Sequence, residues 1–340
     1  MSDIVNYEIK KISDYDIILN ANENNLEMPQ KLRKKINEAL SKVELNRYPE
    51  DSSIKLRQAY AKYLGIDSEE IIVGHGSDEM LGLLIALNII KGTKILTLDP
   101  DFSMYDYYVS MNEGEVVKYQ SDEDGTVNVE KFIQLGLKLK PTLIMFSNPN
   151  NPTGKVISKK DVIKILEAFK DSTIICDEAY IDFCDCSMVE YINSYDNLIV
   201  TRTVSKAFGL AGIRIGFLIA NKNKIDEIKK YKVPYNVNTL SQVVATCVIE
   251  EKDIIQDYIK TIMNERDRVY KQLKDIKLLT VYESESNFLY ARSNNKDNIL
   301  KALEDNSILI RDYVGKDTFR ITIGTSYEND KVIEVLKSIR

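Results

Sequence analysis

The sequence predicts an α/β fold in which a mostly parallel sheet is sandwiched by helices and a smaller α+β domain accompanies it. The first of two observations is a rhythm of short apolar runs, separated by segments that permit helices, between residues 71 and 219. This rhythm is typical of parallel sheets, because the connection between two parallel strands needs room for a helix. The expected strands are Ile71–Val73, Lys94–Leu98, Glu115–Tyr119, Leu143–Phe146, Thr173–Cys176, Leu198–Thr201 and Ile213–Ile219.

The second observation is a change of pattern after this sheet. A long amphipathic region, 239–276, precedes a new group of strands and helices. The expected strands there are Leu278–Tyr282, Asn287–Ala291, Ser307–Ile310 and Thr318–Thr322, and the expected helices are Lys296–Asp305 and Glu328–Ile339. Near the start, helices are expected at residues 25–43 and 54–64. The sequence therefore predicts a large domain of residues 40–250 and a small domain formed by both chain ends, residues 1–39 and 251–340.

The composition favours a large globular protein of the cytoplasm. The 340 residues, 44% of them hydrophobic, suffice for an extensive core. No apolar run approaches the roughly 18–20 residues of a membrane span, and the first residues lack the apolar stretch of a signal peptide. Four cysteines and one histidine favour neither a disulfide framework nor a metal site. The net charge of −6 argues against a general nucleic-acid surface, but local cations can still hold an anionic substrate.

One lysine is the most informative residue of the chain. Lys206 follows a strand-like run and lies within Thr-Val-Ser-Lys-Ala-Phe-Gly-Leu-Ala-Gly-Ile-Arg, residues 203–214. A buried lysine can lose its proton and attack a carbonyl to form a Schiff base. The hydroxyls of Thr203 and Ser205 and the guanidinium of Arg214 are donors suited to a phosphate. These groups would suit a lysine linked to pyridoxal 5'-phosphate, although a solvated surface lysine is the plainer alternative.

Two further segments place polar groups after expected strands. Residues 148–154, Asn-Pro-Asn-Asn-Pro-Thr-Gly, hold Asn151 in a loop that two prolines make rigid. In residues 177–180, Asp-Glu-Ala-Tyr, the aspartate suits a pyridine nitrogen, which it would keep protonated so that the ring withdraws electrons. Tyr180 and Asn151 suit the 3'-oxygen of the same ring. Ligand sites gather at this edge of α/β sheets, whereas an ordinary turn and a helix-capping aspartate are the alternatives.

A glycine-rich junction lies between an expected strand and an expected helix. Residues 74–79 read Gly-His-Gly-Ser-Asp-Glu, so the backbone at Gly76, Ser77 and Asp78 can receive an anion at the helix N-terminus. The spacing is not that of a dinucleotide or nucleoside-triphosphate loop. The segment is therefore a candidate phosphate site of another kind, or an ordinary turn.

Taken together and in order, these segments resemble fold-type I pyridoxal-phosphate-dependent aminotransferases of class I/II. Four more resemble the histidinol-phosphate aminotransferase family more narrowly: Leu-Asn-Ala-Asn-Glu-Asn at 19–24, Asn-Arg-Tyr-Pro at 46–49, Pro-Tyr-Asn-Val-Asn at 234–238 and Phe-Arg-Ile-Thr-Ile-Gly at 319–324. The resemblance runs from about residue 17 to the C-terminus. Its strength lies in the ordered coincidence of the segments, since each alone is short.

The resemblance implies the cofactor pyridoxal 5'-phosphate and a set of residues that bind it. Lys206 is expected to carry the cofactor and to move the substrate's proton as the catalytic residue, and Asp177 to pair with the pyridine nitrogen. Phe102 stands where the family commonly has a tyrosine stacked on the ring, so stacking is kept and a hydroxyl is lost. The expected cofactor-binding residues are Tyr48, Gly76, Ser77, Asp78, Phe102, Asn151, Asp177, Tyr180, Thr203, Ser205, Lys206 and Arg214.

The resemblance also implies substrate contacts and a partner. Arg320, with Asn151, is expected to bind the substrate carboxylate or phosphate. Tyr7, or alternatively Tyr15, is a candidate contact for the substrate phosphate in a short N-terminal segment. Tyr48 is expected to reach the cofactor phosphate of a neighbouring subunit, which implies a homodimer with shared active sites. A structural ion pair for Arg320 and a packed surface tyrosine for Tyr48 are the alternatives.

The leading hypothesis is a cytosolic aminotransferase that passes nitrogen from L-histidinol phosphate to 2-oxoglutarate, as in histidine biosynthesis. Another phosphorylated or aromatic amine is an alternative substrate. A decarboxylase of an O-phosphoamino acid would use the same cofactor, because the orientation of the substrate decides which bond breaks. A ligand-sensing protein that kept only the fold is a third hypothesis.

Overall fold

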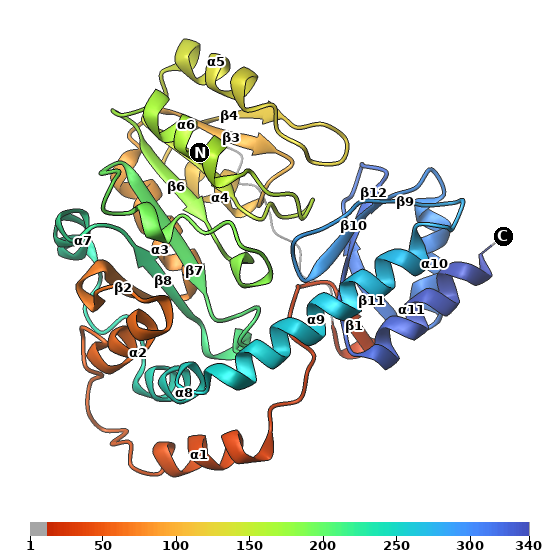
Figure 1. The fold of residues 1–340 in the computed structure, drawn as a ribbon, viewed down its shortest axis with the longest axis horizontal. Coiled ribbons are helices and arrows are strands. Elements are labelled where there is room, and N and C mark those ends of the chain that lie inside the picture. Colours follow the sequence, from red (N-terminus) through yellow and green to blue (C-terminus); the bar gives the residue numbers. More distant parts are fainter. Residues whose placement is uncertain (1–11, 340) are drawn as a thin grey trace.

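Two sheets organise the chain. The structure, a computed structural model, describes residues 12–339 (Figure 1). The larger sheet has seven strands in the order β2-β8-β7-β6-β5-β3-β4, and the smaller has five in the order β1-β11-β12-β10-β9. In the larger sheet, β8 runs antiparallel to both of its neighbours and the other pairs are parallel. The predicted mostly parallel sheet is therefore confirmed.

The elements alternate along the chain as the sequence pattern requires. The strands are β1 Ile17–Leu19, β2 Ile71–His75, β3 Lys94–Asp99, β4 Glu115–Gln120, β5 Leu143–Ser147, β6 Thr173–Asp177, β7 Leu198–Thr203, β8 Ile215–Ile219, β9 Thr280–Val281, β10 Phe288–Arg292, β11 Ile308–Asp312 and β12 Thr318–Thr322. The helices are α1 Gln30–Leu40, α2 Ile54–Leu64, α3 Gly76–Asn88, α4 Met104–Met111, α5 Val129–Leu139, α6 Lys159–Ala168, α7 Lys222–Ile228, α8 Thr239–Ile249, α9 Lys252–Leu273, α10 Lys296–Asp305 and α11 Ser326–Ser338.

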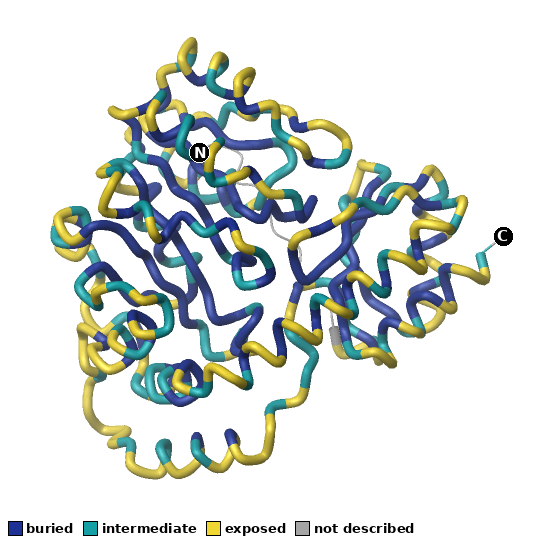
Figure 2. Tube along the Cα trace, in the orientation of Figure 1, coloured by how far each residue is buried: buried dark blue, intermediate teal, exposed yellow. Residues whose placement is uncertain are grey.

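Helices cover both faces of the larger sheet because successive strand residues point to opposite sides. Ile72, Ile175 and Leu218 share one apolar core with the buried residues of α3 and α4. Their neighbours, such as Ile174 and Phe217, belong to a second core with α2, α5 and α6. Figure 2 shows the central strands buried along their length, while the outer faces of the helices are exposed. The sheet therefore holds the ends of its strands in fixed relative positions.

The smaller sheet brings the two ends of the chain together. Strand β1 pairs in parallel with β11, and β11, β12, β10 and β9 then pair antiparallel. Helix α10 packs beside β11, α9 beside β10, and α11 against α9. The pairing of β1 places the segment after it, residues 20–24, between the two sheets, where it contacts Tyr180 and Thr322. The division into domains of residues 40–250 and of both chain ends stays a prediction.

Several element bounds differ from those expected. The first helix begins only after Pro29, because a residue that precedes proline disfavours helical backbone. The amphipathic region 239–276 forms two helices that part at residues 250–251, and the strand expected at 278–282 is only Thr280–Val281. Strand β1 was not predicted, since three residues carry too little pattern. Within residues 12–339, no helix combines the length and the apolar character that crossing a membrane requires.

Candidate active site

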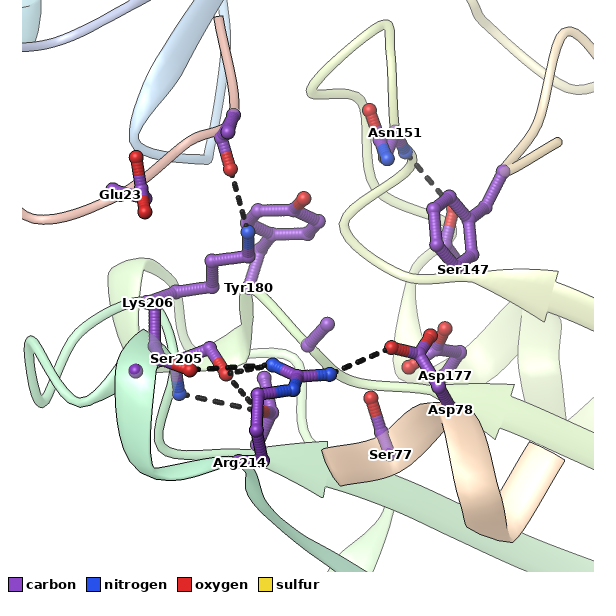
Figure 3. A pocket seen from close by; sticks show the side chains of 16 residues that line it. Glu23, Ser77, Asp78, Ser147, Asn151, Asp177, Tyr180, Ser205, Lys206 and Arg214 are labelled. Carbon is purple, nitrogen blue, oxygen red and sulfur yellow. Dashed lines mark hydrogen bonds and ion pairs between the residues drawn. The ribbon is translucent and has the colours of Figure 1, made fainter. Parts of the chain in front are cut away.

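A cavity of about 320 Å³ lies where β5, β6 and β7 end and α3 begins (Figure 3). The segment after β1 closes it from the side of the smaller sheet. Ten of the predicted site residues line this cavity: Ser77, Asp78, Phe102, Asn151, Asp177, Tyr180, Thr203, Ser205, Lys206 and Arg214. Residues that are up to about 140 positions apart thus share one site because the parallel strands end at one edge.

Lys206 stands between the two ends of the cavity. It is half-buried, and its Nζ donates a hydrogen bond to the carbonyl oxygen of Ala21 at 2.7 Å. Burial, together with the nearby guanidinium of Arg320, lowers the pKa of Lys206 to about 8. A substantial fraction of this amine is therefore neutral in mildly alkaline solution, as a nucleophile must be.

One end of the cavity gathers hydrogen-bond donors around a guanidinium, and we call Ser77, Asp78, Thr203, Ser205 and Arg214 the arginine end. Arg214 Nη2 pairs with Asp78 Oδ2 at 2.9 Å, and its Nη1 lies 3.5 Å from Ser205 Oγ. The Thr203 hydroxyl lies 2.9 Å from Ser205 Oγ. The Ser77 and Asp78 amides belong to the first turn of α3, where amides have no partner within the helix. Hydroxyls, amides and a guanidinium thus converge as donors for an anion.

Gly76 makes the arginine end possible. Its φ of +75° lies in the left-handed region, and a Cβ atom there would lie 2.7 Å from Arg214 Nη2. Any larger residue would displace the guanidinium and strain the backbone. Gly76 therefore leaves room for the Arg214 guanidinium, although it does not line the cavity itself.

Asp177 is a buried carboxylate at the end of β6. Tyr105 Oη donates to its Oδ2 at 2.9 Å and Thr201 Oγ1 to its Oδ1 at 3.0 Å. Burial raises the pKa of Asp177 to about 6, and these two hydrogen bonds limit the rise. A buried carboxylate of this kind is stabilised by a cation in the cavity, such as a protonated ring nitrogen.

At the other end of the cavity, Asn151 and Tyr180 line the wall, and Arg320 and Asn22 bind them from behind. We call these four residues the asparagine end. Asn22 Nδ2 donates to Tyr180 Oη at 2.9 Å. Arg320 Nη1 donates to Asn151 Oδ1, and Arg320 Nη2 donates to the carbonyl oxygen of Asn20 at 2.8 Å. Because Asn151 accepts through Oδ1, its Nδ2 is left as a donor for a ligand.

Besides Gly76, the predicted residues Arg320 and Tyr48 do not line this cavity. Arg320 is buried behind Asn151, with its guanidinium 5.1 Å from the ring centre of Phe288. Tyr48 is 81% exposed and stacks on Tyr235 with ring centres 4.9 Å apart. Tyr7 lies outside the described residues. Tyr48 therefore packs against Tyr235 on the surface of its own chain and has no role in this chain's cavity.

Other site residues were not predicted. Glu23 and Ser147 line the cavity, Tyr105 binds Asp177, and Asn22 binds Tyr180. The Ser147 hydroxyl donates to the carboxyl of Asp101, and burial raises the pKa of Asp101 to about 8. Two of these residues could have been found from the sequence. Tyr105 lies one helical turn after Phe102, and Ser147 directly follows an expected strand. Nothing in the sequence pattern distinguished Asn22 from its neighbours.

The residues present fit the cofactor that the resemblance implied. Pyridoxal 5'-phosphate carries a phosphate, a pyridine nitrogen, a 3'-oxygen and an aldehyde. The arginine end suits the phosphate, Asp177 suits the protonated nitrogen, and Lys206 suits the aldehyde. Asn151 Nδ2 and Tyr180 Oη suit the 3'-oxygen, and Phe102 adds an aromatic wall.

Comparison with known proteins agrees with this geometry. The family model of aminotransferases of class I and II matches residues 15–336. A histidinol-phosphate aminotransferase of Clostridium novyi is 43% identical over 326 residues, which cover 95% of this chain and 91% of that protein. The enzyme of the same name from Pyrococcus furiosus is 36% identical, with 98% and 96% covered. The chain belongs to the class I and II aminotransferases and, within them, to the histidinol-phosphate aminotransferase family.

The solved structures agree as well. A histidinol-phosphate aminotransferase of Clostridium acetobutylicum superposes with a TM-score of 0.86 at 27% identity, covering 94% of this chain and 98% of that one. The enzyme of the same name from Sinorhizobium meliloti, in complex with pyridoxal 5'-phosphate, gives 0.87 at 23% identity, with 96% and 92% covered. At such identity the second likeness speaks for the fold alone. The predicted fold-type I architecture is thus confirmed.

Proposed function

We propose that this chain is a pyridoxal-phosphate-dependent aminotransferase that passes the amino group of L-histidinol phosphate to 2-oxoglutarate, giving imidazole-acetol phosphate and L-glutamate. The observation that carries the proposal is the position of Lys206 between an anion-binding end and a buried carboxylate in one cavity. The names of relatives at 36–43% identity over nearly the whole chain support this substrate.

The cofactor would be held at four points by side chains from separate elements. Arg214, Ser205 and Thr203, with the amides of Ser77 and Asp78, would bind its phosphate. When bound, the cofactor supplies an aldehyde that takes up amino groups and a protonated ring that withdraws electrons from the α-carbon of the substrate. Further contacts would come from Asp177 at the ring nitrogen, Asn151 and Tyr180 at the 3'-oxygen, and Phe102 on the ring face.

The chain's own groups then move one proton. Lys206 Nζ, once free, would remove the proton from the substrate α-carbon and deliver it to the cofactor carbon that had carried the aldehyde oxygen. General acid–base work of this kind commonly contributes about 10²–10⁴-fold in rate. Its lowered pKa suits both tasks near neutral pH. Asp177 keeps its negative charge beside the ring nitrogen, because the bonds from Tyr105 and Thr201 favour the ionised form.

Arg320 is proposed to bind the carboxylate of glutamate and the phosphate of histidinol phosphate in turn. A planar guanidinium suits either anion. Its present contacts are with Asn151 Oδ1 and the carbonyl oxygen of Asn20, and its buried Nε has no hydrogen-bond partner among residues 12–339. The contribution of Tyr7 to the substrate phosphate stays a prediction.

The decisive assay supplies the purified protein with cofactor, L-histidinol phosphate and 2-oxoglutarate, and measures glutamate. Glutamate should form only when both substrates are present, and the Lys206→Ala variant provides the background. Carbon dioxide is measured in the same vessel with O-phosphoserine and O-phosphothreonine, because a decarboxylase would release it without an oxoacid. Absence of amino transfer at millimolar L-histidinol phosphate would rule out this substrate.

The functional unit is proposed to be a homodimer of the cytoplasm in which Tyr48 binds the cofactor phosphate held by the partner subunit. Support comes from the exposure of Tyr48 and of its neighbour Leu45, 80% exposed, neither of which lines the chain's own cavity. The free state of Cys176, Cys184, Cys186 and Cys247 supports a reducing compartment. Mixing inactive Lys206→Ala subunits with Tyr48→Ala subunits tests the shared site, because hybrids contain one intact site and should regain activity.

A further inference from the structure

Asn22 is a buried amide at the point where the two sheets meet. It has no exposed surface, and its φ of 56° lies in the left-handed region, which asparagine tolerates better than most residues. Asn287 Nδ2 donates to its carbonyl oxygen at 3.0 Å. The backbone of Asn22 is therefore fixed, and its side chain spans the space between Thr322 of β12 and Tyr180.

The direction of each hydrogen bond around Asn22 can be worked out. The Thr322 hydroxyl accepts a hydrogen bond from the backbone N–H of Asn22 at 3.0 Å. It donates its own proton to the side-chain oxygen Asn22 Oδ1 at 3.0 Å. Since Oδ1 is thus an acceptor, the other end of the side chain is the NH₂ group, which donates to Tyr180 Oη at 2.9 Å. The Tyr180 oxygen is therefore an acceptor in this bond, and its own proton is available for a group in the cavity that Tyr180 lines.

Asn151 is set in the same way by the smaller sheet. Its Oδ1 accepts from Arg320 on β12, so its NH₂ group is the end that a cavity ligand meets. Both neighbours of the proposed 3'-oxygen position are thus made donors by residues from the other sheet. An oxygen that carries negative charge is stabilised by two such donors.

We propose that Asn22 is a positioning residue that orients the Tyr180 hydroxyl so that it donates to the 3'-oxygen of the cofactor. The proposal rests on the proposed function, since it concerns the same cofactor. Asn22 itself touches neither cofactor nor substrate and acts through Tyr180. A hydrogen bond from Tyr180 stabilises negative charge on the 3'-oxygen. The loss of this bond should therefore raise the pKa of the bound cofactor.

The test uses the Asn22→Asp variant of the holoenzyme. Aspartate has the same shape and still accepts from Thr322, but it accepts from Tyr180 instead of donating to it, so the tyrosine proton turns away from the cavity. The measurement is the pH midpoint of the absorbance change of the bound cofactor. We expect a shift of about one pH unit or more to higher pH, as for a hydrogen bond to a charged group. The shift in Tyr180→Phe should have the same direction.

Two controls separate orientation from added charge. The Asn24→Asp variant adds the same charge two positions away, where the side chain contacts the carbonyl oxygen of Ala207 instead of Tyr180. Its midpoint should move much less than that of Asn22→Asp. In a double-mutant cycle, Asn22→Asp made in the Tyr180→Phe background should lose most of its effect. An equal shift with and without the tyrosine hydroxyl would overturn the proposal, because charge alone would then account for it.

A second variant keeps the test open if Asn22→Asp does not fold. Thr322→Val removes the donor that fixes the orientation of the Asn22 amide while keeping the shape of the side chain. We expect a smaller shift of the midpoint in the same direction, and an unchanged midpoint would count against the role of Asn22. The two proposals fail differently: if the wild-type protein forms no cofactor absorbance band, the proposed function fails, whereas a normal band with no shift in the variants refutes only the role of Asn22.

Discussion

The arginine end and the asparagine end of the cavity are built in different ways. The arginine end uses side chains from strand ends and a helix start of the larger sheet alone. The asparagine end joins side chains from both sheets, and its bonds connect positions 158 and 169 residues apart. The anion-binding groups are thus positioned by one sheet, although Arg214 and Asp78 are 136 positions apart, whereas the groups around the ring depend on how the two sheets meet. Substitutions at the two ends should therefore affect different measurements.

The largest effect is expected at Lys206, which serves both ends. Replacement by alanine removes the amine that holds the cofactor and moves the substrate proton, so turnover should fall by at least about 10³-fold. The cofactor should still bind through the arginine end, without a covalent link. Single-turnover absorbance measurements check both points, with exposed Lys138→Ala as the matched control. Unchanged turnover in Lys206→Ala would contradict the assignment.

The next effect concerns pH. Because the pKa of Lys206 is about 8 in the cofactor-free protein, its neutral and reactive form grows as the pH rises toward 8 and then levels off. The initial rate of covalent cofactor uptake should be about 50-fold lower at pH 6 than at pH 8. Stopped-flow absorbance measures this rate, and Nα-acetyl-lysine, with an ordinary pKa of about 10.4, is the reference. A rate that keeps rising in parallel with the reference beyond pH 9 would show that the pKa is not lowered.

At the arginine end, Arg214→Ala should weaken the binding of the cofactor. Loss of a hydrogen-bonded charge at a phosphate commonly costs about 1.5–3 kcal/mol, so the dissociation constant should rise about 10- to 150-fold. Turnover at saturating cofactor should change little, because the proposed role of Arg214 is to bind the cofactor phosphate and not to act on the reacting carbon. Equilibrium titration of the cofactor-free protein gives the constant, and exposed Arg33→Ala is the control. A normal dissociation constant would place the phosphate elsewhere.

At the asparagine end, Arg320→Lys should lower kcat/KM and leave the binding of the cofactor nearly unchanged. Its effect should be smaller than that of Arg214→Ala. Lysine cannot maintain the bonds to Asn151 and Asn20 together, nor can it bind a carboxylate with two parallel bonds. We expect kcat/KM for glutamate to fall about tenfold, as for the loss of roughly one hydrogen bond, while the cofactor dissociation constant stays within about threefold. Steady-state kinetics and cofactor titration measure the two quantities. If both variants raised only the cofactor dissociation constant, the distinction between the ends would be wrong.

The sequence predicted the arginine end better than the asparagine end for a physical reason. Ser77 and Ser205 follow strands whose apolar runs are visible locally, and Arg214 directly precedes β8, whose antiparallel direction places its start at the same edge. Lys206, Asp177 and Tyr180 were predicted for the same reason, and all three line the cavity.

Contacts between the sheets were not predictable in this way. The bond from Asn22 to Tyr180 depends on the pairing of the short strand β1 with β11, which no local pattern indicates. Arg320 was expected in contact with substrate, but its bonds to Asn151 and Asn20 arise only when the two sheets are packed. The seven-stranded sheet was predicted strand by strand, because most of its strands are short apolar runs that are buried in the core.

Borohydride reduction can show whether the amine of Lys206 forms the covalent link to the cofactor, on which the proposed function depends. The holoenzyme is reduced, digested and analysed by mass spectrometry. We expect a single pyridoxyl-phosphate label on the peptide that contains Lys206, with loss of activity in proportion to labelling. A label on another lysine, or an active enzyme with Lys206 unlabelled, would contradict it.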